Sequence, residues 1–232
     1  MQDSPLCEVL GRRQRAWLQA VLGPGPGPPP ALRLVASGSV LLGSLGYESP
    51  GALPADRIQC SGDDWVCYQP AQTHFLHTVA NASGPGCVVV LTGDYHYGDI
   101  KVAQPGGGWP YSAALSTAGL QRPVYQLMSS GLTASTASGG PQACEGSYHE
   151  DLVALRPPLP SSPGAGNSSG GGGDGRCAYA PQPNFGLVEV DWEARVVRLQ
   201  IRNAADGTLA VAKDGRSQMS LALSLDSCRP LP

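Results

Sequence analysis

Three residues that can bind metal ions lie close together near the middle of the chain: Asp94, His96 and Asp99. They follow residues 87–92, an uninterrupted apolar and β-branched run typical of a strand covered on both faces. In an open α/β sheet, functional loops follow the ends of such strands. Carboxylate and imidazole groups suit Fe, Zn, Mn or Ca, so the segment is a candidate metal site. The structural alternative is a turn aspartate beside a half-exposed histidine.

Hydrophobic spacing indicates the elements that would position this segment. Apolar residues recur at helical spacing over residues 11–22 and 72–82. Short apolar runs predict strands, and two alternating runs joined by a polar turn predict an antiparallel hairpin. The expected strands cover residues 31–38, 87–92, 111–115 and 124–128, the hairpin covers 185–192 and 196–202, and a last strand covers 219–225. Helices that alternate with strands indicate an α/β fold.

The composition argues against several classes of protein. The 232 residues include 15 Lys and Arg against 18 Asp and Glu, giving a net charge of −3 without a lysine-rich run. We therefore expect no nucleic-acid partner. No apolar run approaches the roughly 18 residues of a transmembrane segment. The N-terminal residues do not resemble a secretory signal, although a secreted or endomembrane parent protein remains compatible with the sequence. The sequence assigns neither a compartment nor an oligomeric state.

Glycine and proline are unusually frequent, with 31 and 22 residues, against a usual share of about 12% for the two together. Residues 161–175 are almost entirely Ser, Gly and Pro. Apolar content is low throughout residues 134–176. A segment of this composition cannot offset its ordering entropy by burial, so the sequence predicts a disordered, low-complexity loop here.

The seven cysteines form an odd set whose spacing matches no zinc-binding pattern. Two disulfides are conceivable in an oxidising compartment, one closing a loop around a tryptophan and one joining the ends of the low-complexity loop. These candidate pairs are Cys60 with Cys67 and Cys144 with Cys177. Two triplets that begin at Asn81 and Asn167 fit the acceptor pattern for N-linked glycosylation, a pattern that also arises by chance in Ser-rich chains.

Several segments, in order along the chain, resemble the PhoD-like phosphatases, the alkaline phosphatase D group of calcineurin-type metallophosphoesterases. Residues 88–100, VVVLTGDYHYGDI, are similar to the strand and loop that close the metal site in that family. The other matching segments are 10–18 (LGRRQRAWL), 34–38 (LVASG), 64–65 with 75–76, 125–133 (YQLMSSGLT) and 184–186 (NFG). The match is collinear from about residue 10 to residue 225 and is interrupted by the low-complexity loop.

The resemblance implies a helix-flanked β-sandwich of the metallophosphoesterase type that ends in an antiparallel hairpin. It also implies metal-dependent hydrolysis of a phosphate ester, with Asp94 and His96 as metal ligands and the metal unidentified among Ca, Fe, Mn and Zn. Tyr95, Tyr97, Ser129 and Ser130 are the residues it suggests for substrate binding. For the two tyrosines, packing is the alternative, because alternation at a strand end would turn them inward equally well.

The family's first half carries an Asp-x-Asp strand, a metal-bridging aspartate and an Asn-His/Asp loop, none of which occurs in this sequence. We therefore expect residues 1–133 to be the C-terminal half of a PhoD-like domain. Residues 134–176 would form the low-complexity loop, and residues 177–232 the closing hairpin and last strand. The alternative is a non-catalytic family remnant that acts as a binding or interaction module.

Overall fold

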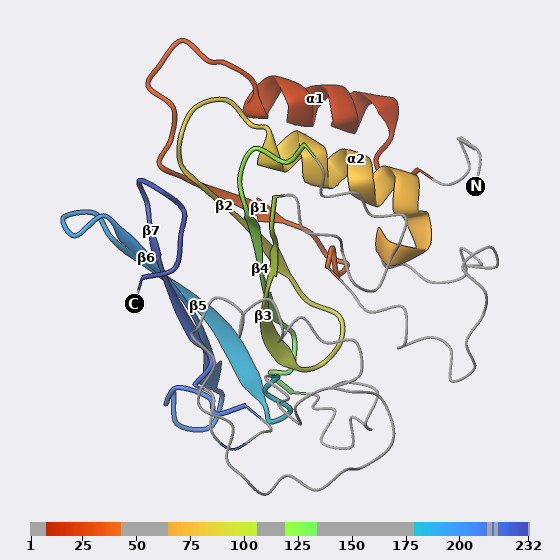
Figure 1. Cartoon of the computed structure of the whole chain (residues 1–232). Coiled ribbons are helices and arrows are strands. Elements are labelled where there is room, and N and C mark those ends of the chain that lie inside the picture. Colours follow the sequence, from red (N-terminus) through yellow and green to blue (C-terminus); the bar gives the residue numbers. More distant parts are fainter. Residues whose placement is uncertain are drawn as a thin grey trace, which may run out of the picture.

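The computed structural model describes residues 8–42, 65–105, 119–133, 179–212, 215 and 218–231. In this part of the chain, two helices cover one face of a sheet and a second sheet covers the other (Figure 1). The elements are α1 (Arg12–Leu22), β1 (Leu32–Ala36), the 3₁₀ turn η4 (Trp65–Tyr68), α2 (Gln69–Ala80), β2 (Cys87–Thr92), β3 (Gly98–Ala103), β4 (Val124–Ser129), β5 (Asn184–Asp191), β6 (Val196–Asn203) and β7 (Ser220–Ser224). This mixed α/β sandwich confirms the expected fold class.

The first sheet has the strand order β1-β2-β4-β3. Strands β1, β2 and β4 run parallel, and β3 pairs antiparallel with β4. Because β2 has neighbours on both sides and layers on both faces, all its side chains are buried or nearly so. This explains its continuous apolar sequence. The run from residue 87 to 92 therefore forms the central strand that the sequence predicts.

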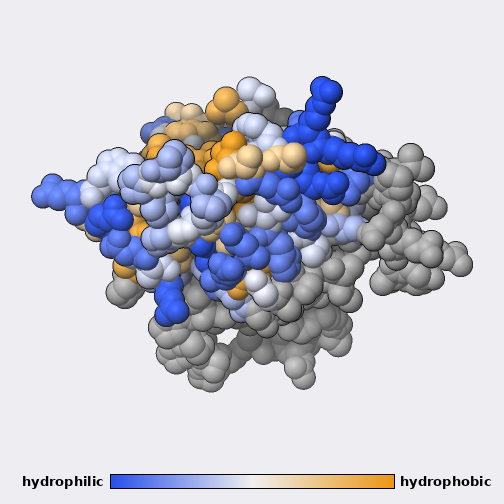
Figure 2. Space-filling model, turned by 90° about the horizontal axis from the view of Figure 1, so that it is seen from above, coloured by the Kyte–Doolittle hydropathy of each residue, from blue (hydrophilic) through white to orange (hydrophobic). Residues whose placement is uncertain are grey.

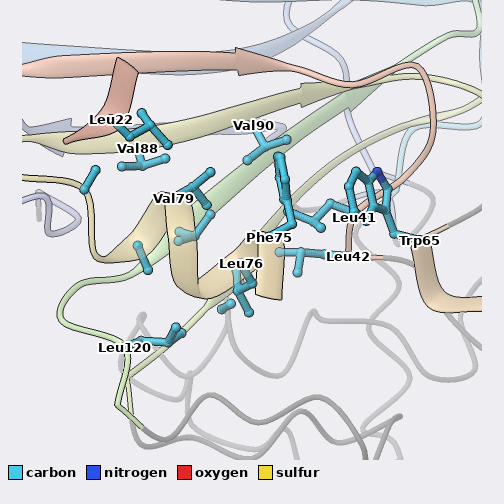
Figure 3. Close-up of a cluster of buried hydrophobic side chains, with 14 of the residues drawn as sticks. Leu22, Leu41, Leu42, Trp65, Phe75, Leu76, Val79, Val88, Val90 and Leu120 are labelled. Atoms are coloured by element: carbon cyan, nitrogen blue, oxygen red, sulfur yellow. The ribbon is translucent and has the colours of Figure 1, made fainter. Parts of the chain in front are cut away.

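Alternation along β2 divides the hydrophobic interior into two layers. Val88 and Val90 pack with α2 residues such as Phe75 in the layer beneath the helices (Figure 3). Cys87 and Val89 lie on the opposite face, in the layer shared with the second sheet. This period of two is the geometry of an extended strand, and it lets one short run contribute to both cores.

The second sheet is antiparallel, with the order β5-β6-β7. Its central strand, β6, sends Val197, Leu199 and Ile201 into the layer that faces the first sheet. The two sheets approach closely at Gly98, where an added Cβ would lie 2.6 Å from Ile201 Cγ2. Glycine is therefore required there for packing rather than for its backbone conformation. The hairpin that the sequence predicts is confirmed.

Some expectations concern residues outside the described part of the chain. The expected strand at 111–115 and the low-complexity loop at 134–176 both fall there, and the proposed division at residues 133 and 176 stays a prediction. Strand β3 was not predicted, because its polar start resembles a loop. Where the structure describes the chain, no helix is long and apolar enough to cross a membrane. The surface on the α1 side mixes hydrophobic and strongly hydrophilic side chains (Figure 2).

Strand β1 forms an open edge of the first sheet in the described part of the chain, since its only strand partner there is β2. Leu34 is 49% exposed on this strand. Unpaired edges with apolar side chains promote association between chains. We expect Leu34→Lys to lower light scattering by the concentrated protein several-fold, while changing stability by less than about 0.5 kcal/mol.

Trp192→Lys provides the matched control for this edge. Trp192 is also a large exposed hydrophobic side chain, 61% exposed, but it lies in the turn between β5 and β6 rather than along a strand edge. If Trp192→Lys lowers scattering as much as Leu34→Lys does, association depends on exposed apolar area in general and not on the β1 edge.

Candidate functional site

The carboxyl ends of the parallel strands β1, β2 and β4 meet at one edge of the first sheet. Ser37 follows β1, Asp94 and His96 follow β2, and Ser130 follows β4. The ends of β1 and β2 are tied together because the Ser37 N–H donates to the Leu91 carbonyl at 2.9 Å. In open α/β sheets, ligands bind at this edge. The topology thus brings the predicted metal ligands and one predicted substrate-binding serine to the same place.

The loop between β2 and β3 alternates exposed and buried side chains. Asp94 and His96 are exposed, whereas Tyr95 and Tyr97 are buried. Asp94 has φ 89° and His96 has φ 58°, in the left-handed region that non-glycine residues rarely occupy. Each such residue costs about 1–3 kcal/mol, and residues of this kind cluster at functional sites. The backbone therefore presents one carboxylate and one imidazole to solvent from a loop that packing holds in place.

An aromatic cluster holds this loop from beneath. The ring centroids of Tyr95 and Tyr97 are 5.8 Å apart, and those of Tyr97 and Tyr179 are 5.2 Å apart with an edge-on arrangement. Val40 and Met128 complete the cluster. Burial of both rings favours the packing alternative over contact with substrate. Within the site, Tyr95 and Tyr97 thus act as anchors for the exposed residues beside them.

The end of β4 fixes the position of the histidine. The backbone N–H of His96 donates to Ser130 Oγ at 2.9 Å. Gly93 makes room for this contact, because a Cβ there would lie 3.2 Å from Ser130 Cβ. The Ser129 hydroxyl instead donates to Asn184 Oδ1 at 2.7 Å, which links β4 to the start of β5. Ser130 thus contacts the loop between β2 and β3 directly, whereas Ser129 joins the two sheets.

Asp99 is buried beneath the exposed loop. Its Oδ2 lies 2.8 Å from Lys101 Nζ, and the side chains of Asp99 and Lys101 are only 2% and 4% exposed. Burial raises the pKa of Asp99, and the nearby Lys101 charge opposes that shift. Asp99 Oδ1 has no hydrogen-bond partner within the described residues. Although Asp99 belongs to the same polar cluster in the sequence, it pairs within the interior and is not exposed beside Asp94 and His96.

Two supporting residues were missed by sequence reasoning. Asn184 donates from Nδ2 to the carbonyls of Gln182 (2.7 Å) and Ala180 (3.4 Å) while it accepts from Ser129. Trp65 donates from Nε1 to Ser37 Oγ at 3.0 Å, which holds the segment after β1. Both residues occur in segments that carry the family resemblance, and that was the available signal. Their partners lie too far away in sequence to be paired by pattern.

Asp94 and His96 offer two donors of the types that Zn, Fe and Mn accept. Neither side chain makes a hydrogen bond within the described part of the chain, so both are available to a ligand. The described residues contain no group of three or more His, Cys, Asp or Glu suited to a metal ion. The donor set therefore fits part of a coordination sphere, and a closed site needs ligands beyond these two residues.

No family model and no curated protein matches the chain. One solved structure that resembles it, titled "Structure of PhoD", has a TM-score of 0.49 and 12% sequence identity. The alignment covers 97% of this chain and 35% of that chain, so the present chain spans about a third of the length of that structure.

Proposed function

We propose that the chain is part of a metal-dependent phosphoric ester hydrolase of the PhoD-like type, to which it contributes Asp94 and His96 as metal ligands. The observation that carries this proposal is the position of the Asp94–His96 loop, which leaves both donors exposed at the carboxyl edge of the parallel strands. The ordered sequence segments shared with that family supply the reaction class. When bound, the metal would stabilise negative charge on the phosphoryl oxygens and activate water.

The residues around the two ligands have supporting roles in this proposal. Ser130 Oγ accepts a hydrogen bond from the His96 N–H, which holds in place the backbone that carries the imidazole. The buried Tyr95 and Tyr97 keep the loop from collapsing onto the sheet. The mechanism requires further donors to complete coordination. We propose that these come from chain outside the described residues or from a second polypeptide.

The first test measures hydrolysis of an aryl phosphate and an aryl phosphodiester by the purified chain, with and without Mn²⁺, Zn²⁺, Fe³⁺ or Ca²⁺. We expect metal-dependent turnover that His96→Ala lowers more than about 100-fold, because loss of even an outer ligand contact costs 10- to 100-fold. Asp94→Asn should raise the metal concentration needed for half-maximal rate. Equilibrium dialysis with the same metals provides a readout that does not depend on turnover.

His74→Ala is the matched control, because His74 is also solvent-accessible but lies on α2. It should leave both metal binding and turnover unchanged. Equal losses in His74→Ala and His96→Ala would contradict a specific role for the loop.

A second candidate function is a binding module without catalysis. The absence of a three-donor group among the described residues favours it. A folded wild-type chain that neither binds these metals in dialysis nor hydrolyses either ester would support this candidate and overturn the first.

A further inference from the structure

Asn81 lies at an exposed position directly after α2 and begins the triplet Asn81-Ala82-Ser83. This triplet has the acceptor pattern for N-linked glycosylation. A glycan is bulky and hydrophilic, so the folded protein must present the modified asparagine at its surface. The end of α2 meets this requirement, since Gly84 and Pro85 beyond the triplet are exposed as well.

The amide group of Asn81 is oriented so that the folded protein accommodates a sugar on its nitrogen. The backbone N–H of Gln121 points at its Oδ1 at 3.1 Å. An N–H can only donate, so the oxygen must face Gln121 and the nitrogen must face away. Within the described part of the chain, Nδ2 makes no hydrogen bond. A sugar attached to Nδ2 would leave the amide oxygen in place, so the bond to Gln121 would survive the modification.

A separate observation concerns the compartment. Cys87 and Cys228 form a buried disulfide between the start of β2 and the turn after β7. Structural disulfides form and persist in oxidising environments such as the endoplasmic reticulum and the cell exterior. The endoplasmic reticulum is also where asparagine-linked oligosaccharides are added. The disulfide, which joins Cys87 to the distant Cys228, is a separate feature from the acceptor triplet, and it indicates the compartment in which such triplets are modified.

We propose that Asn81 is a site of N-linked glycosylation. A bond forms between Asn81 Nδ2 and the anomeric carbon of an oligosaccharide carried on a lipid diphosphate. The bond from that carbon to the diphosphate breaks, the lipid diphosphate leaves, and the amide nitrogen loses one proton. This modification is independent of the phosphatase proposal and extends beyond it.

The folded structure also determines when the reaction occurs. The N–H and hydroxyl of Ser83 both donate to the Leu22 carbonyl, at 2.9 and 3.2 Å. The Ser83 carbonyl accepts a hydrogen bond from Arg33, and Ala82 is buried. In this arrangement the partly exposed Ser83 hydroxyl is already bonded to the Leu22 carbonyl and is not free to engage a transferase. Transfer must therefore precede folding, and the folded, unmodified protein should not be a substrate.

The test expresses the full chain in cultured eukaryotic cells, once behind a cleavable secretory leader and once without it. Both versions carry Asn167→Gln, which removes the other acceptor triplet. Total lysate and medium are digested, treated with peptide N-glycosidase in ¹⁸O water and analysed by mass spectrometry. Because modification precedes folding, this readout does not depend on secretion of folded protein. We expect ¹⁸O-labelled aspartate at position 81 in at least half of the leader-directed chains and in none of the cytosolic ones.

Substitutions of Ser83 give matched controls. Ser83→Thr keeps the hydroxyl and should retain occupancy at Asn81, whereas Ser83→Ala and Asn81→Gln should abolish the labelled peptide. Occupancy below one half in the leader-directed chain would overturn the proposal. Loss of label with Ser83→Thr, or label that persists with Ser83→Ala, would overturn it too.

Discussion

Replacing Lys101 with methionine is expected to destabilise the protein by about 3–5 kcal/mol, because it leaves a buried carboxylate without its countercharge. Lys101 Nζ and Asp99 Oδ2 are 2.8 Å apart on β3, and both side chains are almost fully buried. The second oxygen of Asp99, Oδ1, already lacks a hydrogen-bond partner among the described residues. No other described group would therefore compensate the carboxylate charge once the lysine is removed. Urea denaturation at neutral pH measures the effect.

The destabilisation should depend on pH in a defined direction. Burial raises the pKa of Asp99 above its ordinary value of 3.8, while Lys101 lowers it. Without the lysine only the burial effect remains, so the pKa of Asp99 rises further. When a carboxyl group has a higher pKa in the folded than in the unfolded state, the free energy of unfolding of the protein falls as pH rises from the unfolded pKa through the folded pKa. The deficit of Lys101→Met relative to wild type should thus be larger at pH 7.5 than at pH 4.5.

The double variant Asp99→Leu with Lys101→Met tests the physical cause. Replacing a whole buried ion pair by apolar residues of similar volume is often neutral or stabilising. We expect the double variant to recover most of the stability lost in Lys101→Met and to show no added pH dependence. A loss below about 1 kcal/mol in the single variant would mean that the pair is solvated in solution.

The sequence predicted the central part of the fold because its signals are local. The run at residues 87–92 needs burial on both faces, and only the centre of a covered sheet provides this. The helices and the β5–β6 hairpin likewise follow from spacing within one segment. Strand β3 was missed because Asp99 and Lys101 occupy inward positions where the pattern requires apolar residues. Their pairing compensates the two charges, and that pairing is visible only in three dimensions.

In the candidate site too, some features follow from local sequence and others only from the three-dimensional fold. Asp94 and His96 were selected because they follow a buried strand, and the structure places both at the exposed edge. The contact of Ser130 with His96 spans 34 residues and depends on the pairing of β2 with β4. Sequence spacing could not assign Tyr95 and Tyr97 to substrate or to packing, and their burial with Tyr179 favours packing. Residue types identified the candidate ligands, whereas topology determined their surroundings.

The disulfide illustrates the limit of sequence spacing most clearly. The paired cysteines, Cys87 and Cys228, are 141 residues apart, and nothing local connects them. The pairs considered from the sequence, Cys60 with Cys67 and Cys144 with Cys177, were close neighbours or ends of one loop. Cys60, Cys144 and Cys177 lie outside the described residues, so both pairs stay predictions. Cys87 and Cys228 meet because the start of β2 in the first sheet lies against the turn after β7 in the second.

Reducing the Cys87–Cys228 disulfide is expected to lower the stability of the protein by about 3–5 kcal/mol. In the chain-entropy model, a cross-link over 141 residues raises the free energy of the unfolded chain by about 5 kcal/mol, because it removes conformational entropy. Measured values are commonly smaller. For a chain of this size, the loss corresponds to a fall in melting temperature of roughly 10 °C. Thermal and urea denaturation with and without a phosphine reductant measure it.

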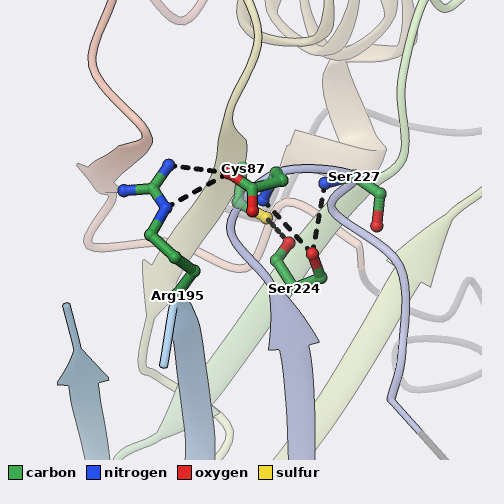
Figure 4. A network of polar contacts seen from close by, with 5 residues as sticks. Cys87, Arg195, Ser224 and Ser227 are labelled. Atoms are coloured by element: carbon green, nitrogen blue, oxygen red, sulfur yellow. Dashed lines mark hydrogen bonds and ion pairs between the residues drawn. The ribbon is translucent and has the colours of Figure 1, made fainter. Parts of the chain in front are cut away.

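Local hydrogen bonds should hold the turn around Cys228 in place after reduction. The Tyr125 hydroxyl donates to the Cys228 carbonyl at 3.1 Å, and the Cys228 N–H donates to the Ser224 carbonyl at 2.8 Å (Figure 4 shows this turn beside Cys87). Cys87 Sγ lies 3.4 Å from the Ser224 carbonyl oxygen, so a reduced thiol would find an acceptor in place. These contacts do not involve the sulfur–sulfur bond. The reduced protein should therefore keep its native fold at 20 °C. It should lose stability mainly because the unfolded chain gains conformational entropy once the cross-link is broken.

A background variant isolates the effect from the other thiols. Replacing Cys7, Cys60, Cys67, Cys144 and Cys177 with serine leaves only the Cys87–Cys228 pair. In this background, reductant should lower the urea midpoint, and Cys87→Ala with Cys228→Ala should give a similarly low midpoint that reductant no longer changes. Because both alanine substitutions also remove buried sulfur, a midpoint somewhat below that of the reduced protein is expected. If reductant shifts the alanine variant as much as its parent, the stabilisation does not come from this cross-link.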